Sequence, residues 1–321
     1  MGDRGININS FKEKLQHPSS KKLLDQILYF LEYRLTPDLP RSEKSARIHA
    51  LVEQFEKQLG NYSCWRGSDW SEIDESSEAL EYIITREKYK ILFETEPLER
   101  NLDEQLMLAF NSFEFIKPRH LDIQIPPDKE IIFTPAIEQI QNINKYTSPR
   151  DKLVCISNCF RIINKIISSI NEGSVAHGAD ESLPMFVYVV LKSKTPKLFS
   201  NYYYIKRFRY PPRIDHRDNV EFRWTFTSMK IALKFILELS ESKLKLETNE
   251  NYEDLTKGSR EKSRSCQTSP IPPENPEVEL EPIFKPNYKG TVSVDHFVEN
   301  PEDLRQFIDD YFALLGSKYQ K

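Results

Sequence analysis

The chain is poor in glycine, with nine among its 321 residues, and it lacks the glycine-rich signatures of phosphate and dinucleotide binding. GxSxG and HExxH are absent as well. These absences exclude the usual machinery of NTPases, dehydrogenases and the common hydrolases. The sequence therefore predicts no covalent chemistry.

Cysteine is also scarce, with four residues in the chain. Cys155 and Cys159 lie one helical turn apart, but no second pair follows to complete a metal site. The six histidines do not cluster. We therefore predict small buried thiols in a reducing cytosol, and neither a metal nor a bound cofactor.

The chain also has no excess of positive charge, and its formal net charge is −4. No global basic field is available to hold nucleic acid or an anionic membrane. The stretch NYYYIKRFRYPPRIDHR (201–217) could stack bases, but Asp215 and Asp218 dilute its charge and no RNA-binding motif surrounds it. We predict no nucleic-acid partner, and no segment is expected to reach the length of a membrane span.

Apolar residues recur at helical spacing along most of the first 240 residues, and alternating strand patterns are nearly absent. The pattern predicts an all-α protein. Ser148 and Pro149 predict the start of a long buried helix that continues to Ile170. Residues 180–191 are ambiguous because their valines favour a strand, and we predict a helix there. Another helix is predicted from Phe226 to Leu239, where apolar residues again recur at helical spacing. Residues 118–135 are proline-rich and predict a connector.

The composition changes after residue 240. Residues 241–296 are rich in charge, serine and proline and predict a disordered linker. A C-terminal amphipathic helix is expected at 297–316, with Asn300 as its cap. Its apolar face needs either the chain's own helical bundle or a partner to cover it.

Four blocks in order resemble the Vps-nine (vacuolar protein sorting nine) domain family. They are SPRDKLVCISNCFRIINKI, GADESLPMFVYVVLKS, LFSNYYYIKRF and FTSMKIALKFILEL. Upstream segments of 12–117, such as LEYIITREKYKILF, are similar to the helical bundle that precedes that domain, and the plant-type members are expected to be nearest. The resemblance implies a bundle at 12–117 and an exchange domain at 118–240.

Members of this family are guanine-nucleotide exchange factors for Rab-five class GTPases of endosomal and vacuolar trafficking. The resemblance implies that Asp180 is an acidic finger that enters the nucleotide site of the GDP-bound or nucleotide-free GTPase. It also implies contacts with the GTPase from five further residues: Pro184, Tyr188, Asn201, Trp224 and Thr227. The protein is then expected to be cytoplasmic and to reach endosomal membranes by recruitment, with Mg²⁺ and nucleotide belonging to the GTPase.

Trp224 departs from the family, which usually has tyrosine at that position. An indole keeps the aromatic area but loses the hydroxyl acceptor. The departure supports an alternative, a Rab-binding scaffold with weakened exchange. More ordinary interpretations also stand: Asp180 could be a helix cap, Tyr188 a half-buried core residue, and Trp224 simple packing.

Overall fold

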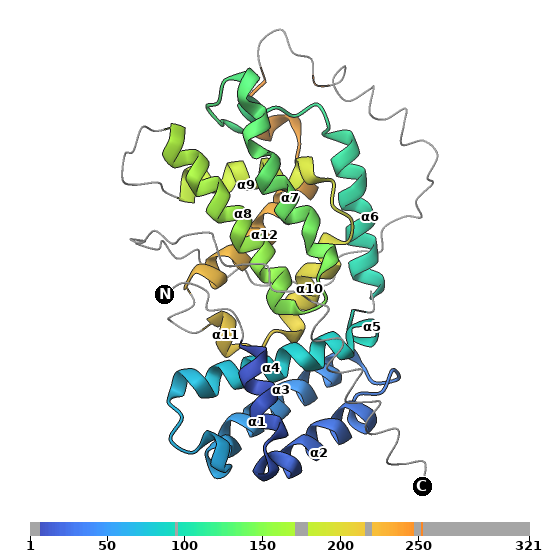
Figure 1. Cartoon of the computed structure of the whole chain (residues 1–321). Coiled ribbons are helices and arrows are strands. Elements are labelled where there is room, and N and C mark those ends of the chain that lie inside the picture. The colour runs from blue at the N-terminus through green and yellow to red at the C-terminus, as the bar shows by residue number, and fades with distance from the viewer. Residues whose placement is uncertain (1–6, 94–95, 171–178, 216–219, 247–251, 253–321) are drawn as a thin grey trace. The chain divides into compact units, whose positions relative to one another are not determined.

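The computed structural model describes residues 7–93, 96–170, 179–215, 220–246 and 252. Within these ranges the chain is helical and contains no strand, which confirms the predicted all-α class (Figure 1). The described residues fall into two compact units. One takes residues 7–34 and 50–83, and the other takes residues 35–49 and the described residues from 84 onward.

The first unit is built around a cluster of aromatic rings. Its elements are α1 (Ile8–Gln16), η1 (Pro18–Ser20), α2 (Lys21–Tyr29), η2 (Phe30–Arg34), the second half of α3 (Arg41–Gln58), η3 (Leu59–Asn61), η4 (Ser63–Trp65) and most of α4 (Trp70–Glu87). Trp65 is 1% exposed, and its ring lies edge-on to Phe55 at 6.2 Å. Its indole N–H donates to the Ser76 hydroxyl at 2.9 Å, so the buried polar group has a partner.

The second unit contains the larger number of the described helices. Its elements from residue 89 on are α5 (Tyr89–Leu92), α6 (Pro97–Ser112), η5 (Pro118–Leu121), η6 (Pro127–Phe133), α7 (Thr134–Asn142), η7 (Ile143–Lys145), α8 (Pro149–Ile170), α9 (Ala179–Ser193), α10 (Leu198–Phe208), α11 (Pro212–Asp215), α12 (Val220–Leu237) and η9 (Glu241–Lys243). Helix α8 packs against α7, α9, α10 and α12 (Figure 1). The pattern predicted this central position, because apolar residues cover a broad face of α8.

Several local predictions are confirmed. The Asp151 N–H donates to the Ser148 hydroxyl at 3.0 Å, as a cap of α8 requires. The ambiguous segment after Asp180 is helical in α9. Two features were missed: the predicted connector at 118–135 contains η5, η6 and the first residues of α7, and α12 begins at Val220 instead of Phe226. Glu221 explains the earlier start of α12, because its carboxylate accepts hydrogen bonds from Ser157 at 2.7 Å and from Arg161 at 2.8 Å, both on α8.

The compact units divide the chain differently from the predicted domains at 12–117 and 118–240. Residues 35–49 and 84–117 fall in the second unit, where Arg41 pairs with Glu99 and α6 lies against α10 and α12. The first residues of the predicted disordered linker are also ordered, since η9 forms at its start and Leu244 is 8% exposed. Apart from residues 241–246 and Tyr252, the predicted linker and the C-terminal helix at 297–316 lie outside the described residues.

The expectation that no segment reaches the length of a membrane span was wrong. Helix α8, at 22 residues, is long and apolar enough by composition to cross a membrane, and it is the one such helix among the described residues. Half of its most apolar window is buried inside the protein. The core helix of a globular domain passes the same test, so this single helix carries little weight.

Candidate functional site

A pocket of about 210 Å³ lies between α9 and α12. Leu183, Pro184 and Val187 line it from α9, and Ile231 and Phe235 line it from α12. Its remaining wall comes from residues 120–122 around the end of η5 and from two lysines after α12, Lys243 and Lys245. The apolar side chains of two neighbouring helices therefore form a concave surface beside the N-terminal half of α9.

Asp180 is the second residue of α9, so it lies in the first turn of that helix. Negative charge is favoured there because the N-terminal N–H groups carry partial positive charge. The side chain of Asp180 lies outside the described part of the structure. Pro184 has no N–H, so the helical bond to the carbonyl of Asp180, four residues earlier, cannot form. The turn that carries Asp180 is thus less strongly held than the rest of α9.

Trp224 and Thr227 lie on α12, one helical turn apart. Trp224 is partly exposed, and its ring lies edge-on to Phe160 at 4.3 Å. Phe160 stacks on Phe186 of α9 at 4.1 Å, so the indole rests on an aromatic stack.

Thr227 is exposed, and its hydroxyl donates to the Arg223 carbonyl at 2.8 Å. Ile231 follows Thr227 by four residues, which places the two on one face of α12. Pro184, Trp224 and Thr227 are therefore available at the surface formed by α9 and α12.

Tyr188 faces the interior instead. It is 3% exposed, its hydroxyl donates to Glu130 at 3.1 Å, and its ring lies 5.1 Å from that of Phe133. Burial raises the pKa of Tyr188, and the Glu130 carboxylate adds to the effect. In this conformation Tyr188 anchors α9 to η6, and its side chain offers almost no surface to a partner.

Asn201 is fully buried and joins two loops. Its side-chain amide donates to Asn144 at 2.8 Å and to the Lys197 carbonyl at 2.7 Å. Its carbonyl oxygen accepts from the Lys152 ammonium at 2.7 Å. Asn201 therefore orders the residues before α8 and α10, and any effect of Asn201 on binding must pass through the residues it positions.

Lys152 is a residue that the sequence pattern did not single out. It is fully buried, and its ammonium also donates to the Ile143 carbonyl at 2.9 Å. The rings of Phe93, Tyr89 and Tyr204 surround it at 4.8, 5.3 and 5.9 Å. Aromatic faces attract a cation, but desolvation opposes the charge and lowers the pKa of Lys152 to about 7. No spacing rule reveals such a residue, because lysine on a helix is usually solvated.

The lowered pKa predicts a pH dependence of stability. Above pH 7 the unfolded chain keeps the Lys152 proton and the folded chain releases it, so folding is favoured as pH rises towards the unfolded pKa. We expect the free energy of unfolding of the wild type, minus that of Lys152→Met, to rise by roughly 1.5–2 kcal/mol between pH 7 and 8.5. Urea unfolding of both proteins measures this difference, and the subtraction removes groups that titrate alike in both. If this difference in the free energy of unfolding does not change with pH, Lys152 keeps its charge in the folded chain.

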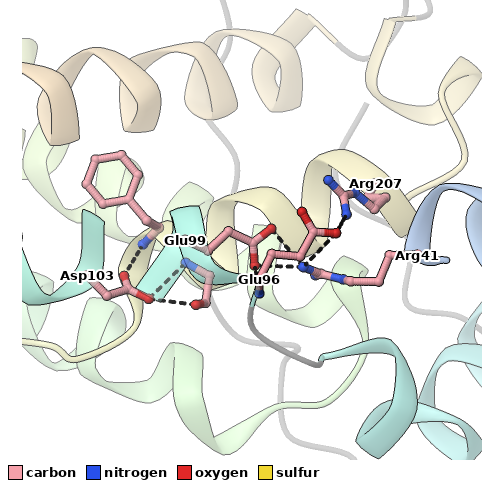
Figure 2. A network of polar contacts seen from close by, with 7 residues as sticks. Arg41, Glu96, Glu99, Asp103 and Arg207 are labelled. Atoms are coloured by element: carbon pink, nitrogen blue, oxygen red, sulfur yellow. Dashed lines mark hydrogen bonds and ion pairs between the residues drawn. The ribbon is translucent and has the colours of Figure 1, made fainter. Parts of the chain in front are cut away.

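A second buried polar network ties α3, α6 and α10 together (Figure 2). The Arg41 guanidinium donates to both oxygens of Glu99 at 2.7 Å, and Arg207 pairs with Glu96 at 2.5 Å. Asp103 accepts from the backbone N–H groups of Phe199 at 2.7 Å and Ser200 at 3.3 Å, at the start of α10. The network thus fixes α10, which carries Asn201. Burial raises the pKa of Glu99 despite Arg41, and the hydrogen bond from Arg207 lowers the pKa of Glu96.

Among the described residues, no group of three or more histidine, cysteine, aspartate or glutamate side chains could hold a metal ion. Cys155 and Cys159 are buried and free. Burial raises the pKa of Cys155 to about 12 and that of Cys159 well above its usual value, so neither thiol is activated as a nucleophile.

The fold and the site together define a helical protein with an apolar groove between α9 and α12. Comparison with known proteins shows which family this part of the chain resembles. Residues 133–241 match the family model described as "Vacuolar sorting protein 9 (VPS9) domain". The chain therefore contains a VPS9 domain, which confirms the resemblance seen in its four sequence blocks. The matched segment runs from the end of η6 to the start of η9 and includes the whole of α9 and α12.

Curated relatives extend the similarity beyond that segment. The chain is 30% identical over 242 residues to "Vacuolar protein sorting-associated protein 9A" of Oryza sativa subsp. japonica, covering 74% of this chain and 50% of the relative. It is 30% identical over 249 residues to the protein of the same name in Arabidopsis thaliana, covering 76% and 47%. It is 29% identical over 242 residues to human "Rab5 GDP/GTP exchange factor", covering 73% and 47%. The chain spans about half the length of these relatives.

Proposed function

We propose that this chain is a guanine-nucleotide exchange factor that promotes GDP release from a Rab-five class small GTPase. The observation that carries the proposal is the VPS9 match over α9 and α12, whose shared surface holds Pro184, Trp224 and Thr227. Relatives named as vacuolar sorting proteins and as a Rab5 GDP/GTP exchange factor support the same class of partner. The proposed partner is the GDP-bound or nucleotide-free GTPase.

In the proposed mechanism the groove binds the switch regions of the GTPase, and Asp180 enters its nucleotide site. There the carboxylate competes with Mg²⁺ and the β-phosphate for the lysine of the phosphate-binding loop, which needs an anion. The coupling is reciprocal, so incoming nucleotide also expels the exchange factor. No covalent bond forms or breaks, and Mg²⁺ and nucleotide belong to the GTPase.

Two features of the chain suit this mechanism. Asp180 lies in the first turn of a helix whose continuation lines the groove, so binding in the groove brings the first turn close to the partner. Pro184 removes the helical bond to the Asp180 carbonyl, which leaves that turn freer to adjust than a regular helix. We further propose that the protein acts in the cytoplasm and is recruited to endosomal or other trafficking membranes where its lipid-anchored partner resides.

The alternative function is a Rab-binding scaffold with weakened exchange. Trp224 favours it, because the indole offers an N–H donor where family members offer a tyrosine hydroxyl. The packing of Trp224 on Phe160 keeps its ring at the groove in either case, so the aromatic contact survives and only the hydrogen bonding differs. The presence of Asp180 favours exchange over the scaffold.

The test is release of a fluorescent GDP analogue from Rab-five class GTPases by the full chain. We expect acceleration of at least about tenfold over spontaneous release, which corresponds to roughly 1.4 kcal/mol of barrier. Binding of the nucleotide-free GTPase without acceleration would establish the scaffold, and Trp224→Tyr would then be expected to restore exchange. If the chain neither binds nor accelerates GDP release from any member of a panel of Rab GTPases, both functions are refuted.

A further inference from the structure

A strip of exposed aromatic and basic side chains runs along α2 and η2 in the first unit. Tyr29 and Tyr33 are 57% and 58% exposed, and their ring centres lie 5.2 Å apart. Lys22 is also exposed, and it lies two helical turns before Tyr29. The opposite face of α2 is buried through Leu23 and Ile27. Lys22, Tyr29 and Tyr33 therefore share the outward face of one helical segment, and we call them the α2 strip.

Three features of the α2 strip indicate that it binds a ligand. Large aromatic side chains with a polar tip are enriched where proteins meet partners. η2 is a π-helical turn, and such turns within helices are frequent at functional sites. Lys21 and Lys22 lie in the first turn of α2, which has no acidic residue, although the N-terminal N–H groups already carry partial positive charge there. The start of α2 therefore has a positive potential that favours an acidic ligand.

The chain itself contains a segment with the complementary pattern. The sequence predicts a helix at 297–316, which lies outside the described residues. From Asn300 to Gly316 this segment has four acidic residues and one basic residue, whereas residues 21–34 have three basic and two acidic ones. Its apolar side chains recur at intervals of three and four residues, as in a helix that packs along another helix: Leu304, Phe307, Ile308, Tyr311, Leu314 and Leu315.

We propose that the C-terminal segment 297–316 docks as an amphipathic helix on the α2 strip of its own chain. A flexible chain of the length of residues 253–299 spans roughly 40 Å, which exceeds the roughly 30 Å diameter of a small domain. Such a tether holds the segment at an effective concentration of about 1 mM, so a dissociation constant of about 0.1 mM keeps it bound roughly nine-tenths of the time. An untethered partner with the same contacts lacks this advantage, which is why we assign the strip to the chain's own segment.

Hydrogen exchange of the full chain, followed by mass spectrometry, tests the docking. The backbone amides of 304–315 should exchange at least about tenfold more slowly than those of a synthetic peptide of residues 297–321, which is the protection that nine-tenths occupancy gives. In the double variant Tyr29→Ser, Tyr33→Ser the same amides should exchange within about twofold of the free peptide, because the aromatic contact is lost. Both tyrosines are more than half exposed, so the fold of the first unit should tolerate the change.

Trp70→Ser is the matched control for the tyrosine variant. Trp70 is 72% exposed in the same unit and lies at the start of α4, so its loss should leave the protection of 304–315 at the wild-type level. The amides around the buried Trp65 report whether each variant remains folded. If the wild-type segment exchanges like the free peptide, the proposal is wrong. If protection survives in the tyrosine variant, or is also lost in Trp70→Ser, the segment does not dock on the α2 strip.

Binding in trans measures the contribution of charge. The full chain carrying Phe307→Ser and Tyr311→Ser, which disable its own segment, is titrated with the dye-labelled peptide of residues 297–321 while fluorescence anisotropy is followed. We expect a dissociation constant of about 0.1 mM, and Lys21→Glu, Lys22→Glu in the same background should raise it at least about threefold. Absence of binding up to about 1 mM, or an unchanged constant after the charge reversal, would overturn the assignment. None of these measurements uses a GTPase, so their outcome is independent of the proposed exchange function.

Discussion

Asp180→Ala is expected to lower kcat/KM for GDP release at least ~100-fold, which corresponds to roughly 2.7 kcal/mol of lost transition-state stabilisation. The reason is the charge. In the proposed mechanism the carboxylate replaces a phosphate oxygen as the partner of a lysine, and no other group at the start of α9 is given that task. Stopped-flow release of a fluorescent GDP analogue, with wild type and variant side by side, measures the effect.

Two further variants identify what the loss is due to. Asp180→Asn keeps the shape and removes the charge, so it should lose nearly as much activity as Asp180→Ala. Glu181→Gln changes the adjacent acid, which is exposed, and should retain most of the wild-type rate. Full activity of Asp180→Asn would eliminate the acidic finger. An equal loss in Glu181→Gln would instead point to a general effect of negative charge at the start of α9.

Arg41→Met is expected to destabilise the protein by roughly 3–5 kcal/mol, because it leaves Glu99 buried without its cation. The Arg41 and Glu99 side chains are only 5% and 2% exposed. Glu99 also accepts from the Glu96 N–H at the start of α6 at 3.4 Å, so an unpaired charge there disturbs the first turn of that helix. Urea denaturation, with the free energy of unfolding extrapolated to water, measures the loss.

The double variant Arg41→Met, Glu99→Leu removes both charges and should regain most of that stability, since replacing a buried ion pair by apolar residues is often neutral. Arg47→Met is the matched control on the same helix. The Arg47 side chain is 28% exposed and pairs with Glu43, one turn away and 46% exposed, so its loss should cost less than about 1 kcal/mol. If Arg41→Met is as mild as Arg47→Met, the network in Figure 2 does not hold α6 and α10 in place.

Periodicity identified most of the helices because they are long and bury one broad face. Helix α8 shows this well, since its apolar residues and the Ser148 cap both lie in a short stretch of chain. Prediction failed where the signal is nonlocal. Helix α12 starts earlier than its apolar stripe because Glu221 bonds to α8. Residues 241–246 are ordered because Leu244 reaches a core formed by residues far away in the sequence.

The candidate site, like the fold, could be predicted from the sequence only in part. The sequence blocks predicted which positions belong together, and the structure places Pro184, Trp224 and Thr227 at the surface of α9 and α12. It buries Tyr188 and Asn201, because solvent exposure depends on what packs against a helix. The pocket wall formed by Lys243 and Lys245 had no sequence signal, since charged residues after a helix are usually solvated.

The sequence by itself determined the helical class, the VPS9 family and the position of the candidate carboxylate, because these depend on residue type and short-range spacing. Only the tertiary structure decided which residues meet. It placed Lys152 inside a ring of aromatics, paired Arg41 with Glu99, and joined Lys245, in a segment predicted to be disordered, to the His120 carbonyl. Such contacts join residues tens of positions apart. Their energies depend on burial and geometry, which no local pattern records.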